Sequence, residues 1–151
     1  MLECTYICPV GKLVICEEDS CIIGLHPDEN AADTAPCSQL LTEARRQLDE
    51  YFSGRRTVFE LPLSPKGTAF QHRVWNELKN VPYGKTACYQ DIAASIGNIK
   101  ASRAVGQAVN KNPIMIIIPC HRIISKDGNI GGFAYDISVK RYLLELEHHN
   151  I

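Results

Sequence analysis

The chain has 151 residues, a formal net charge of −1 and 45% hydrophobic residues, a composition that fits one globular domain or two small lobes. No apolar stretch approaches the roughly 18 residues that a membrane helix needs, and the N-terminus has no signal-peptide pattern. We therefore expect no membrane association and a cytoplasmic protein, or a nuclear one in a eukaryotic cell. The seven cysteines are an odd number without a close-packed framework, and we interpret them as reduced thiols.

The net charge hides an uneven distribution along the chain. Residues 1–65 hold 5 Lys and Arg against 11 Asp and Glu, residues 66–122 hold 8 against 2, and residues 123–151 hold 3 against 4. An acidic first part joined to a basic second part indicates that only the second part contacts a polyanion such as nucleic acid. For any single Lys or Arg, a solvated surface position is the alternative interpretation.

The acidic first part predicts a small sheet and one helix. Leu13–Cys16 and Cys21–Leu25 have the pattern of two strands joined by a polar four-residue hairpin connection. From Ser38, a residue type favoured as an N-cap, apolar residues recur at helical spacing as far as Gly54. We expect this lobe to be structural.

The chain divides near residue 65. The closely spaced prolines and the glycine of Leu61–Gly67 favour an extended connector over a helix or strand. We therefore expect an N-terminal structural α/β lobe over residues 1–65 and a C-terminal lobe over residues 66–151. The predicted fold class is α+β, with a small sheet-containing lobe followed by a mainly helical one.

The basic second part predicts several short helices. Apolar residues from Phe70 to Leu78 mark one face of the first helix. The second helix spans Tyr89–Ile96, the third spans about Ala101–Lys111, and the four-residue turn between them contains glycine. Two helices joined in this way are typical of a helix-turn-helix, which is a DNA-binding motif. A last helix covers Val139–Glu147.

The third of these helices presents a polar face. Arg103, Gln107 and Asn110 fall at positions i, i+4 and i+7, opposite an apolar side. Plain solvent exposure is the alternative interpretation for such a face. The many alanines and Gly106 favour a partner instead, because small side chains let a backbone approach closely inside a narrow groove.

A nucleophile and a proton acceptor follow a wholly apolar run. Ile114–Ile118 precedes Pro119-Cys120-His121-Arg122, and we interpret the run as a strand that delivers a thiol into a pocket. A thiol reacts as its thiolate, and an adjacent imidazole lowers its pKa. The pattern predicts attack by sulfur on an electrophilic carbon, with an inert buried thiol as the alternative.

Together these residues resemble the O6-alkylguanine-DNA alkyltransferase family, the methylated-DNA–protein-cysteine methyltransferases. The motifs that carry the resemblance in the second part are Gly67-Thr68-Ala69-Phe70-Gln71, Val81-Pro82-Tyr83-Gly84-Lys85-Thr86, Tyr89-Gln90, Arg103-Ala104-Val105-Gly106, Asn112-Pro113, Pro119-Cys120-His121-Arg122 and Leu143-Leu144-Glu145-Leu146-Glu147. In the first part the similarity is weaker, chiefly Pro9-Val10-Gly11-Lys12-Leu13 and Leu48–Gly54. The resemblance implies a C-terminal domain that binds DNA through a winged-helix-like helix-turn-helix and transfers alkyl groups.

The resemblance implies direct DNA repair by a suicide methyltransferase. Members of this family bind duplex DNA through the minor groove, rotate an alkylated guanine out of the stack and move its O6 alkyl group irreversibly onto a cysteine. Because an alkylated guanine pairs poorly, its extrusion costs less than that of a normal base. We expect O6-methylguanine as the preferred substrate and O4-methylthymine as a further one. The expected partner is double-stranded DNA that contains the lesion, and we expect a monomer without a cofactor.

The resemblance also implies a catalytic relay. Cys120 accepts the alkyl group, His121 deprotonates Cys120 through a water, and Glu147 orients the imidazole. Asn112 ties the turn between the recognition helix and the active-site segment, and Tyr89 assists departure of the guanine oxygen. The expected catalytic residues are Cys120, His121, Glu147, Tyr89 and Asn112.

Further residues are implied to contact DNA or the flipped base. Arg103 fills the gap that the extruded base leaves, and Tyr89 crowds the phosphate of the target nucleotide. Main-chain groups around Cys120 and Ile123 read the guanine edge. The expected DNA-binding residues are Arg103, Tyr89, Ala101, Ser102, Gln107, Asn110 and Lys111, and the expected pocket residues are Pro119, Ile123, Ile130, Phe133, Ala134 and Tyr135.

The loop Gly131–Asp136, which we call the pocket loop, departs from the family's pattern. Phe133 stands where the family often has tyrosine and lacks its hydroxyl, while Tyr135 and Asp136 stand at positions that are commonly glycine. The pocket wall is then bulkier, which favours methyl over benzyl as the transferred group.

A metal site is not predicted. Cys21-x4-His26 has the spacing of one ligand pair of the structural zinc that some relatives bind. A tetrahedral zinc site needs four ligands, and the other two positions are not matched in register. A strand cysteine and a loop histidine are the simpler interpretation.

Two other classes of function stay open. A non-catalytic lesion-sensing or regulatory DNA-binding module is one, although such sensors carry another residue, often tryptophan, in place of Cys120. A Cys-His hydrolase is the other, but it needs an oxyanion hole and leaves Arg103 unexplained. Turnover discriminates the three, because a hydrolase cycles, an alkyltransferase stops after one event and a binding module never reacts.

Overall fold

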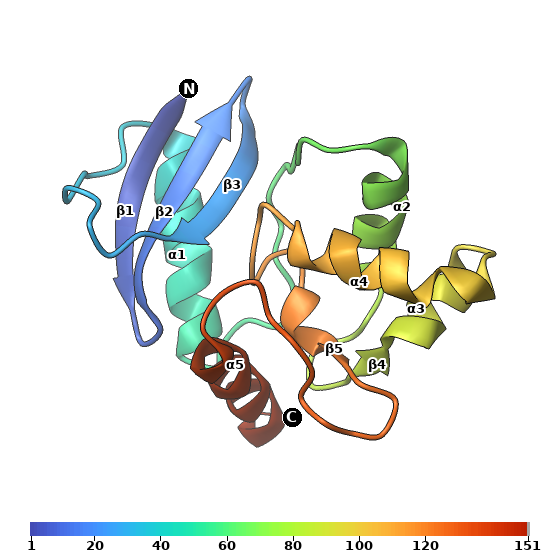
Figure 1. Cartoon of the computed structure of the whole chain (residues 1–151). Helices are drawn as coiled ribbons and strands as arrows, with labels where there is room; N and C mark the ends of the chain where they lie inside the picture. Colours follow the sequence, from blue (N-terminus) through green and yellow to red (C-terminus); the bar gives the residue numbers. More distant parts are fainter. Residues whose placement is uncertain (151) are drawn as a thin grey trace. The chain divides into compact units, whose positions relative to one another are not determined.

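The computed structural model describes residues 1–150 and divides into two compact units, Met1–Lys66 and Gly67–Ile151. The first unit contains a three-stranded sheet and one helix, and the second contains the remaining helices and two very short strands (Figure 1). The expected α+β fold class is confirmed. Within residues 1–150, no helix is long and apolar enough to cross a membrane.

The sheet of the first unit is an antiparallel meander. Its strands are β1 (Leu2–Cys8), β2 (Gly11–Glu18) and β3 (Cys21–Pro27), in the order β1-β2-β3. The expected four-residue connection is a two-residue turn, because Asp19 and Ser20 take positive φ values of 51° and 62°. Two such residues match the twist of a hairpin, which lets both strands extend further. The first strand was not predicted.

Helix α1 (Gln39–Phe52) packs against β1 and β2. Ser38 is its N-cap, as predicted, since the Ser38 Oγ accepts a hydrogen bond from the Leu41 N–H at 3.0 Å. One face of the helix is buried at helical spacing, through Leu41, Ala44, Leu48 and Tyr51. This face and the sheet form the core of the first unit.

The predicted helices of the second unit are confirmed. They are α2 (Ala69–Leu78), α3 (Tyr89–Ser95) and α4 (Ser102–Asn110), and a 3₁₀ turn, η1 (Ile99–Ala101), leads into α4. The Trp75 Nε1–H of α2 donates a buried hydrogen bond of 2.8 Å to the Ala108 carbonyl of α4. This bond fixes α4 from its buried side, so that its polar face is left exposed.

The segment Ile114–Ile118 is buried, but the prediction that it is a strand is wrong. The chain instead makes tight turns, with hydrogen bonds from the Ile117 N–H to the Met115 carbonyl at 2.7 Å and from the Ile118 N–H to the Ile114 carbonyl at 3.0 Å. Ile116 has a φ of 70°, a strained conformation for a β-branched residue. The apolar run reflects burial alone, which periodicity cannot separate from a strand.

The remaining elements surround the thiol. Strands β4 (Ala87–Cys88) and β5 (Ile123–Ile124) pair in parallel, and the 3₁₀ turn η2 (Cys120–Arg122) leads directly into β5. Helix α5 (Ile137–His149) is longer than the predicted Val139–Glu147 and begins at an Asp136 N-cap. Its buried residues are Lys140, Leu143 and Glu147, which share one face.

Candidate active site

Cys120 begins the turn η2 and is buried, with 3% of its surface exposed. Burial raises the pKa of its thiol, while Asn112 and the Lys140 ammonium act in the opposite direction. The thiol is therefore neutral in the resting protein. It needs a proton acceptor inside the site to become a nucleophile.

His121 and Glu147 form a fully buried pair. The His121 Nε2 lies 2.6 Å from the Glu147 Oε2, and the two side chains are 0% and 1% exposed. Turn η2 supplies the histidine and the buried face of α5 supplies the carboxylate. The structure therefore brings these two predicted residues together next to Cys120.

Arg122 holds the same carboxylate from another direction, a contact that the sequence did not indicate. Its Nε donates to Glu147 Oε1 at 2.8 Å, its Nη2 to Glu147 Oε2 at 3.1 Å and its Nη1 to the Val81 carbonyl at 2.8 Å. The Gly84 N–H adds a bond of 3.2 Å to Glu147 Oε1. Although burial by itself raises the pKa of Glu147, the bonds from His121 and Arg122 outweigh it and hold that pKa at about 2. Glu147 is therefore ionised.

The protonation of His121 follows from its partners. Burial lowers its pKa, and Arg122 already balances the charge of Glu147, so the imidazole is neutral at pH 7. An ionised carboxylate only accepts hydrogen bonds, which places the ring proton on Nε2 and the lone pair on Nδ1. Within residues 1–150, Nδ1 is buried and has no hydrogen-bond partner. That atom is available to take a proton.

Asn112 ties together the turns that lead to the thiol. Its Nδ2 donates to the Ile118 carbonyl at 2.8 Å, and its Oδ1 accepts from the Ile114 N–H at 3.0 Å. Both bonds are buried, and they pair two backbone groups that a strand partner would otherwise satisfy. This geometry fits the supporting role that we expected for Asn112.

Lys140 is a buried cation that was not predicted. Its Nζ donates to the Ile123 carbonyl at 2.5 Å and the Gly132 carbonyl at 2.9 Å, and lies 6.0 Å from the centre of the Phe133 ring. Burial lowers the pKa of Lys140 to about 8, against the opposing effect of Cys120. Its spacing of three and seven residues from Leu143 and Glu147 was the available signal, since it places Lys140 on the buried face of α5.

The pocket loop carries two aromatic residues in contact with each other, and the charge of Cys120 acts on one of them, Tyr135. The rings of Phe133 and Tyr135 meet edge to face with centroids 5.7 Å apart, and burial followed by the Cys120 charge raises the pKa of Tyr135. Ala134, between them, is exposed, whereas Pro119 and Ile123 are buried beside Cys120. The structure thus places Tyr135 within electrostatic reach of Cys120.

Tyr89 stands at the start of α3 with its hydroxyl directed at the pocket loop. A β-carbon at Gly131 would lie 3.4 Å from the Tyr89 Oη, and one at Gly106 would lie 3.7 Å from its ring. Burial, and then the charge of Cys120, raises the pKa of Tyr89. The phenol therefore keeps its proton at neutral pH and can donate it.

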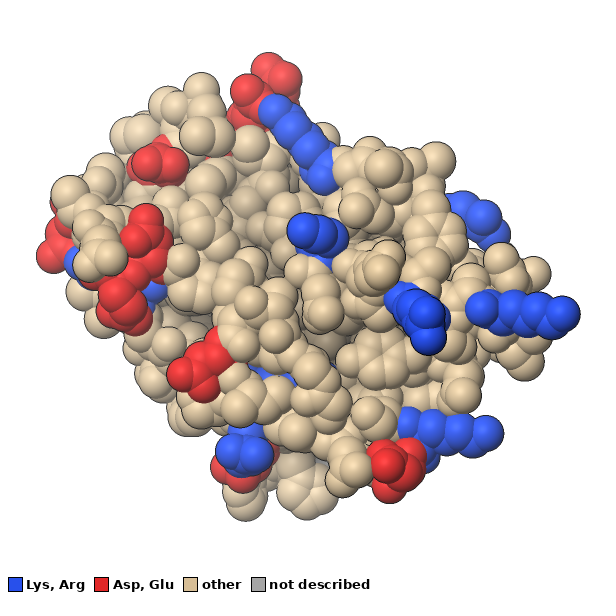
Figure 2. Space-filling model, in the orientation of Figure 1, with Lys and Arg blue, Asp and Glu red and all other residues tan. Residues whose placement is uncertain are grey.

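An open pocket of about 410 Å³ joins Tyr89 to the helix-turn-helix. Its lining consists of Tyr89, Gln90, Ser102, Arg103, Gly106, Ser125 and Lys126. Of the other residues expected to bind DNA, Gln107, Asn110 and Lys111 are exposed and Ala101 is half-buried. Acidic side chains gather over the first unit and basic ones stand out over the unit that carries α3 and α4 (Figure 2).

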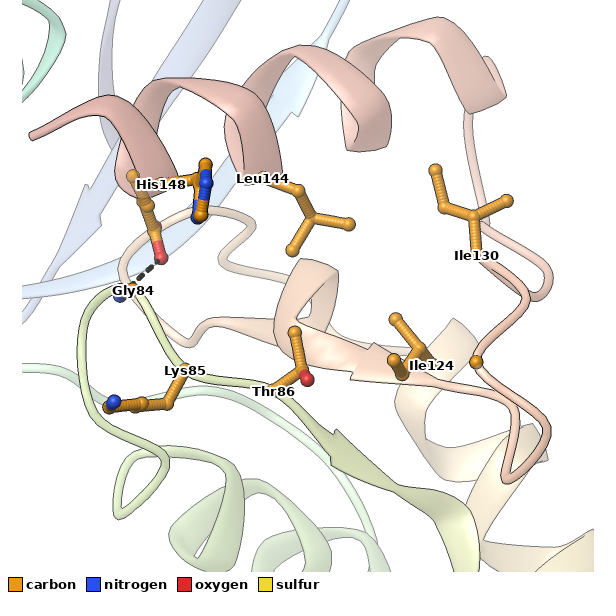
Figure 3. Close-up of a pocket in the computed structure, with 9 residues that line it drawn as sticks. Gly84, Lys85, Thr86, Ile124, Ile130, Leu144 and His148 are labelled. Carbon is orange, nitrogen blue, oxygen red and sulfur yellow. Dashed lines mark hydrogen bonds between the residues drawn. The ribbon is translucent and has the colours of Figure 1, made fainter. Parts of the chain in front are cut away.

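Ile130 lies in a different pocket from Tyr89 and Arg103. This second pocket, of about 370 Å³, is lined by Gly84, Lys85, Thr86, Ile124, Gly128, Ile130, Leu144, Glu147 and His148. Leu144, Thr86 and Ile124 point toward one another across it, and Lys85 extends away (Figure 3). The lining of neither pocket includes Cys120, and the contact of Ile130 with a flipped base stays a prediction.

The donor sets for a metal are sparse. Within residues 1–150, no group of three or more His, Cys, Asp or Glu side chains is arranged to hold a metal ion. Cys21 is half-buried on β3, as expected of a strand cysteine, but His26 lies on the same strand, so its interpretation as a loop residue is wrong. A ligand pair alone does not make a tetrahedral site.

The fold and the site define a class of protein in which a helix-turn-helix stands beside a buried cysteine that has its own proton acceptor. Residues 69–149 match the model of the 6-O-methylguanine DNA methyltransferase DNA-binding domain, and residues 1–65 match that of the ribonuclease-like domain of the same proteins. The chain belongs to the O6-methylguanine DNA methyltransferase family, which confirms the resemblance seen in its motifs.

Comparisons with individual proteins and structures support the same family assignment. A methylated-DNA–protein-cysteine methyltransferase of Methanosarcina barkeri is 50% identical over 123 residues, which cover 82% of this chain and 78% of the relative. The constitutive one of Bacillus subtilis is 44% identical over 149 residues, 92% of this chain and 90% of the relative. The crystal structure of Mycobacterium tuberculosis O6-methylguanine methyltransferase superposes with a TM-score of 0.89 at 39% identity, over 99% of this chain and 93% of that one. The structure of OGT from the same organism in complex with DNA has a TM-score of 0.89 at 40% identity, over 97% and 92%.

Proposed function

We propose that this protein repairs alkylated DNA by moving the alkyl group of an O6-alkylguanine onto Cys120, once and irreversibly. The family and its relatives support the coarser statement, that the protein is a methyltransferase that takes a methyl group from DNA onto one of its own cysteines. The observation that carries the finer one is the buried arrangement of Cys120, His121 and Glu147, in which Nδ1 of the neutral imidazole is left as a proton acceptor.

The relay supplies the nucleophile. The Cys120 proton passes to His121 Nδ1, through a water, and the imidazolium that forms is stabilised by its 2.6 Å contact with Glu147. Arg122 keeps Glu147 ionised before and after the transfer. The ammonium of Lys140 favours the thiolate over the thiol. The charge thus forms only inside the site, where a substrate carbon can receive it.

The transfer is a substitution at the alkyl carbon. A bond forms between the Cys120 sulfur and the carbon, the bond from that carbon to guanine O6 breaks, and its electron pair stays on the base. The departing guanine takes up one proton, for which the Tyr89 hydroxyl is the donor that we propose. The proton that the Cys120 thiol gave to His121 returns to Tyr89 through solvent, so that no proton is gained or lost overall. The product is a thioether that no group in the site can cleave, so each molecule reacts once.

DNA reaches the site through the helix-turn-helix. The exposed face of α4 carries Arg103 and Gln107, and Arg103 and Tyr89 both line the open pocket. A stacked base keeps its O6 carbon out of reach of a buried thiol, so the alkylated nucleotide has to leave the helix, with Arg103 in its place. The lesion-bearing duplex is then the partner, and one copy of the chain suffices for the reaction.

The pocket favours a small alkyl group. Tyr135, which is within electrostatic reach of Cys120, and Phe133 place two rings in one loop, and the Lys140 bond to the Gly132 carbonyl holds that loop. We infer that methyl is transferred faster than benzyl, and that O6-methylguanine is preferred to O4-methylthymine.

The test is mass spectrometry of the protein after incubation with a duplex that carries one O6-methylguanine. The proposal requires one added methyl group on the peptide that contains Cys120, in an amount equal to the guanine restored, and no added mass on Cys120→Ser. A duplex with O4-methylthymine and one with O6-benzylguanine, run in parallel, rank the substrates.

Two results would contradict the proposal. Lesion-selective binding without added mass, by protein whose thiols are shown to be reduced, would indicate a lesion-sensing module. Added methyl on another of the seven cysteines would show that the relay around Cys120 is not the reactive site.

A further inference from the structure

The pocket of about 410 Å³ beside Tyr89 and Arg103 is lined by two separate parts of the chain. Tyr89, Ser102 and Arg103 come from α3 and α4, whereas Ser125 and Lys126 come from the loop that follows β5. Among the residues of the described chain that line this pocket, two are cationic and none is acidic. Such a lining complements a phosphodiester rather than a neutral base.

The loop that carries Lys126 is built around its own hydrogen bonds. The Ser125 N–H donates to the Asn129 carbonyl and the Gly128 N–H to the Ser125 carbonyl, both at 3.0 Å. The Asp127 carboxylate accepts from the Asn129 N–H at 3.1 Å and from its Nδ2 at 2.9 Å. The acidic neighbour of Lys126 is therefore engaged within the loop, and the backbone at Lys126 is fixed.

The charge of Lys126 is not neutralised by an ion pair. Within residues 1–150, no carboxylate lies within 4.0 Å of its ammonium group. The charge of Lys126 lowers the pKa of the Asp91 carboxyl, but only as the smallest of several causes. The main cause is the hydrogen bond that Asp91 accepts from the Cys88 N–H at 3.0 Å. The Lys126 side chain is exposed and faces solvent at the pocket rim.

We propose that Lys126, on the loop that follows β5, binds a backbone phosphate beside the lesion. Arg103 and Lys126 then hold the lesion-bearing strand from two sides, and the loop 125–130 becomes a second DNA-contacting element next to the helix-turn-helix. The inference rests on the proposed function, since it takes the alkylated strand to enter this pocket. A rotated nucleotide draws its flanking phosphates toward the rim, where an unpaired cation stabilises them.

The first test is the salt dependence of binding to a duplex with one O6-methylguanine. All proteins in this comparison carry Cys120→Ser, so that transfer does not remove the lesion during the binding measurement. Lys126→Gln is compared with the protein that keeps Lys126, with Lys126→Arg, and with Lys79→Gln as a matched loss of an exposed lysine in the same unit. The logarithm of the association constant falls linearly with the logarithm of the salt concentration. Loss of one phosphate contact makes this slope less negative by about 0.9 and weakens binding roughly fivefold at 0.15 M salt. Lys126→Arg and Lys79→Gln leave the slope unchanged. An unchanged slope for Lys126→Gln overturns the proposal.

The second test locates the phosphate. Single neutral methylphosphonate linkages are placed in turn at the phosphates that flank the lesion, and binding is measured at each one. At the contacted linkage the protein with Lys126 loses affinity, whereas Lys126→Gln, which already lacks the contact, keeps its affinity. At every other linkage the two proteins lose the same affinity. Equal changes at every linkage would contradict a contact from Lys126.

A methyl-transfer assay on the wild type, with Cys120 intact, separates this inference from the proposed function. Methyl transfer to Cys120 by the wild type, with an unchanged slope for Lys126→Gln, refutes only the phosphate contact. No transfer by the wild type, with the slope reduced for Lys126→Gln, refutes the repair chemistry and keeps the contact.

Discussion

The guanidinium of Arg122 holds the carboxylate of Glu147 through two hydrogen bonds, of 2.8 Å from Nε and 3.1 Å from Nη2. Both side chains are buried, and the same carboxylate accepts from His121 at 2.6 Å. One buried anion is thus balanced by one permanent cation, which leaves the imidazole neutral. A neutral imidazole is what a general base at physiological pH has to be.

Arg122→Met is expected to change the protonation of His121. Without the guanidinium, the Glu147 charge favours a protonated imidazole, so the pKa of His121 rises and Nδ1 no longer accepts the Cys120 proton. Methyl transfer falls by at least about 100-fold, and the free energy of unfolding falls by about 3–5 kcal/mol. NMR titration of the His121 ring, single-turnover kinetics and urea denaturation measure the three effects.

The control for this variant is Arg141→Met, which removes an exposed arginine from α5 and leaves all three quantities unchanged. Arg122→Lys keeps the charge without the paired bonds and falls between the two. An unaltered His121 pKa in Arg122→Met would refute the role assigned to the guanidinium.

Acid is expected to destabilise the protein through Glu147 and His121. The pKa of Glu147 is about 2 in the folded state against an ordinary 4.5, so its contribution to stability is complete above pH 4.5 and is lost as the pH falls through 2. The lowered pKa of His121 acts in the same direction below its ordinary 6.5. Glu147→Gln flattens the fall between pH 4.5 and 2 by up to about 3 kcal/mol.

Urea denaturation at a series of pH values measures this effect. Glu145→Gln, an exposed change two residues away on α5, is the matched control and leaves the pH dependence as in the wild type. A wild-type curve that Glu147→Gln does not flatten would show that the carboxylate is not held ionised by its neighbours.

Lys140 is expected to act in the alkaline range. Its pKa is about 8 in the folded state against an ordinary 10.5, so the unfolded chain binds more protons between these values and stability rises with pH there. Lys140→Met abolishes this rise. The raised pKa of Cys120 acts oppositely above 9, and the comparison is therefore made in a Cys120→Ser background.

With Cys120 present, Lys140→Met is also expected to slow methyl transfer about tenfold at neutral pH, because the thiolate loses a nearby cation. The pH profile of the single-turnover rate shifts to higher pH, a change that a merely structural role would not produce. Lys140→Arg restores part of the rate. An unshifted profile in Lys140→Met would rule out an electrostatic effect on Cys120.

Asn112→Ala is expected to destabilise the turns before the thiol. The change leaves the buried Ile114 N–H without its partner and removes one of the two hydrogen bonds to the Ile118 carbonyl, which still accepts from the Cys120 N–H. We expect a cost of about 1–3 kcal/mol in the free energy of unfolding. Methyl transfer slows because Cys120 is no longer held in place. Denaturation and single-turnover rates are compared with Asn76→Ala, an exposed change on α2 that keeps wild-type stability and rate. Equal stabilities of the two variants would contradict the role of Asn112.

Much of the fold was predictable from local signals. The N-cap at Ser38, the apolar spacing of α1 and α2, and the glycine between α3 and α4 are features of neighbouring residues, and the helices they predicted are present. The apolar run Ile114–Ile118 was wrongly predicted to be a strand. Its Ile118 carbonyl and Ile114 N–H form hydrogen bonds with the Asn112 side chain rather than with a neighbouring strand. Strands β4 and β5 have two residues each, too few to show any periodicity.

The site residues were predictable where the reactive groups are neighbours in the sequence. Cys120 and His121 are adjacent, and Glu147 came from the family resemblance. Arg122 lies in the same motif, but its bond to Glu147 spans 25 residues and depends on the packing of α5. Lys140 was missed because a lysine on an amphipathic helix is normally exposed, although its spacing placed it on the buried face.

The most direct test of irreversible transfer to Cys120 is a titration of the protein with an excess of duplex that carries O6-methylguanine with a deuterated methyl group. The account predicts that the guanine restored equals the protein added, that the reaction then stops, and that all the deuterium is on Cys120. Continued repair beyond one lesion per protein molecule, or deuterated methanol in solution, would contradict it and indicate a hydrolase.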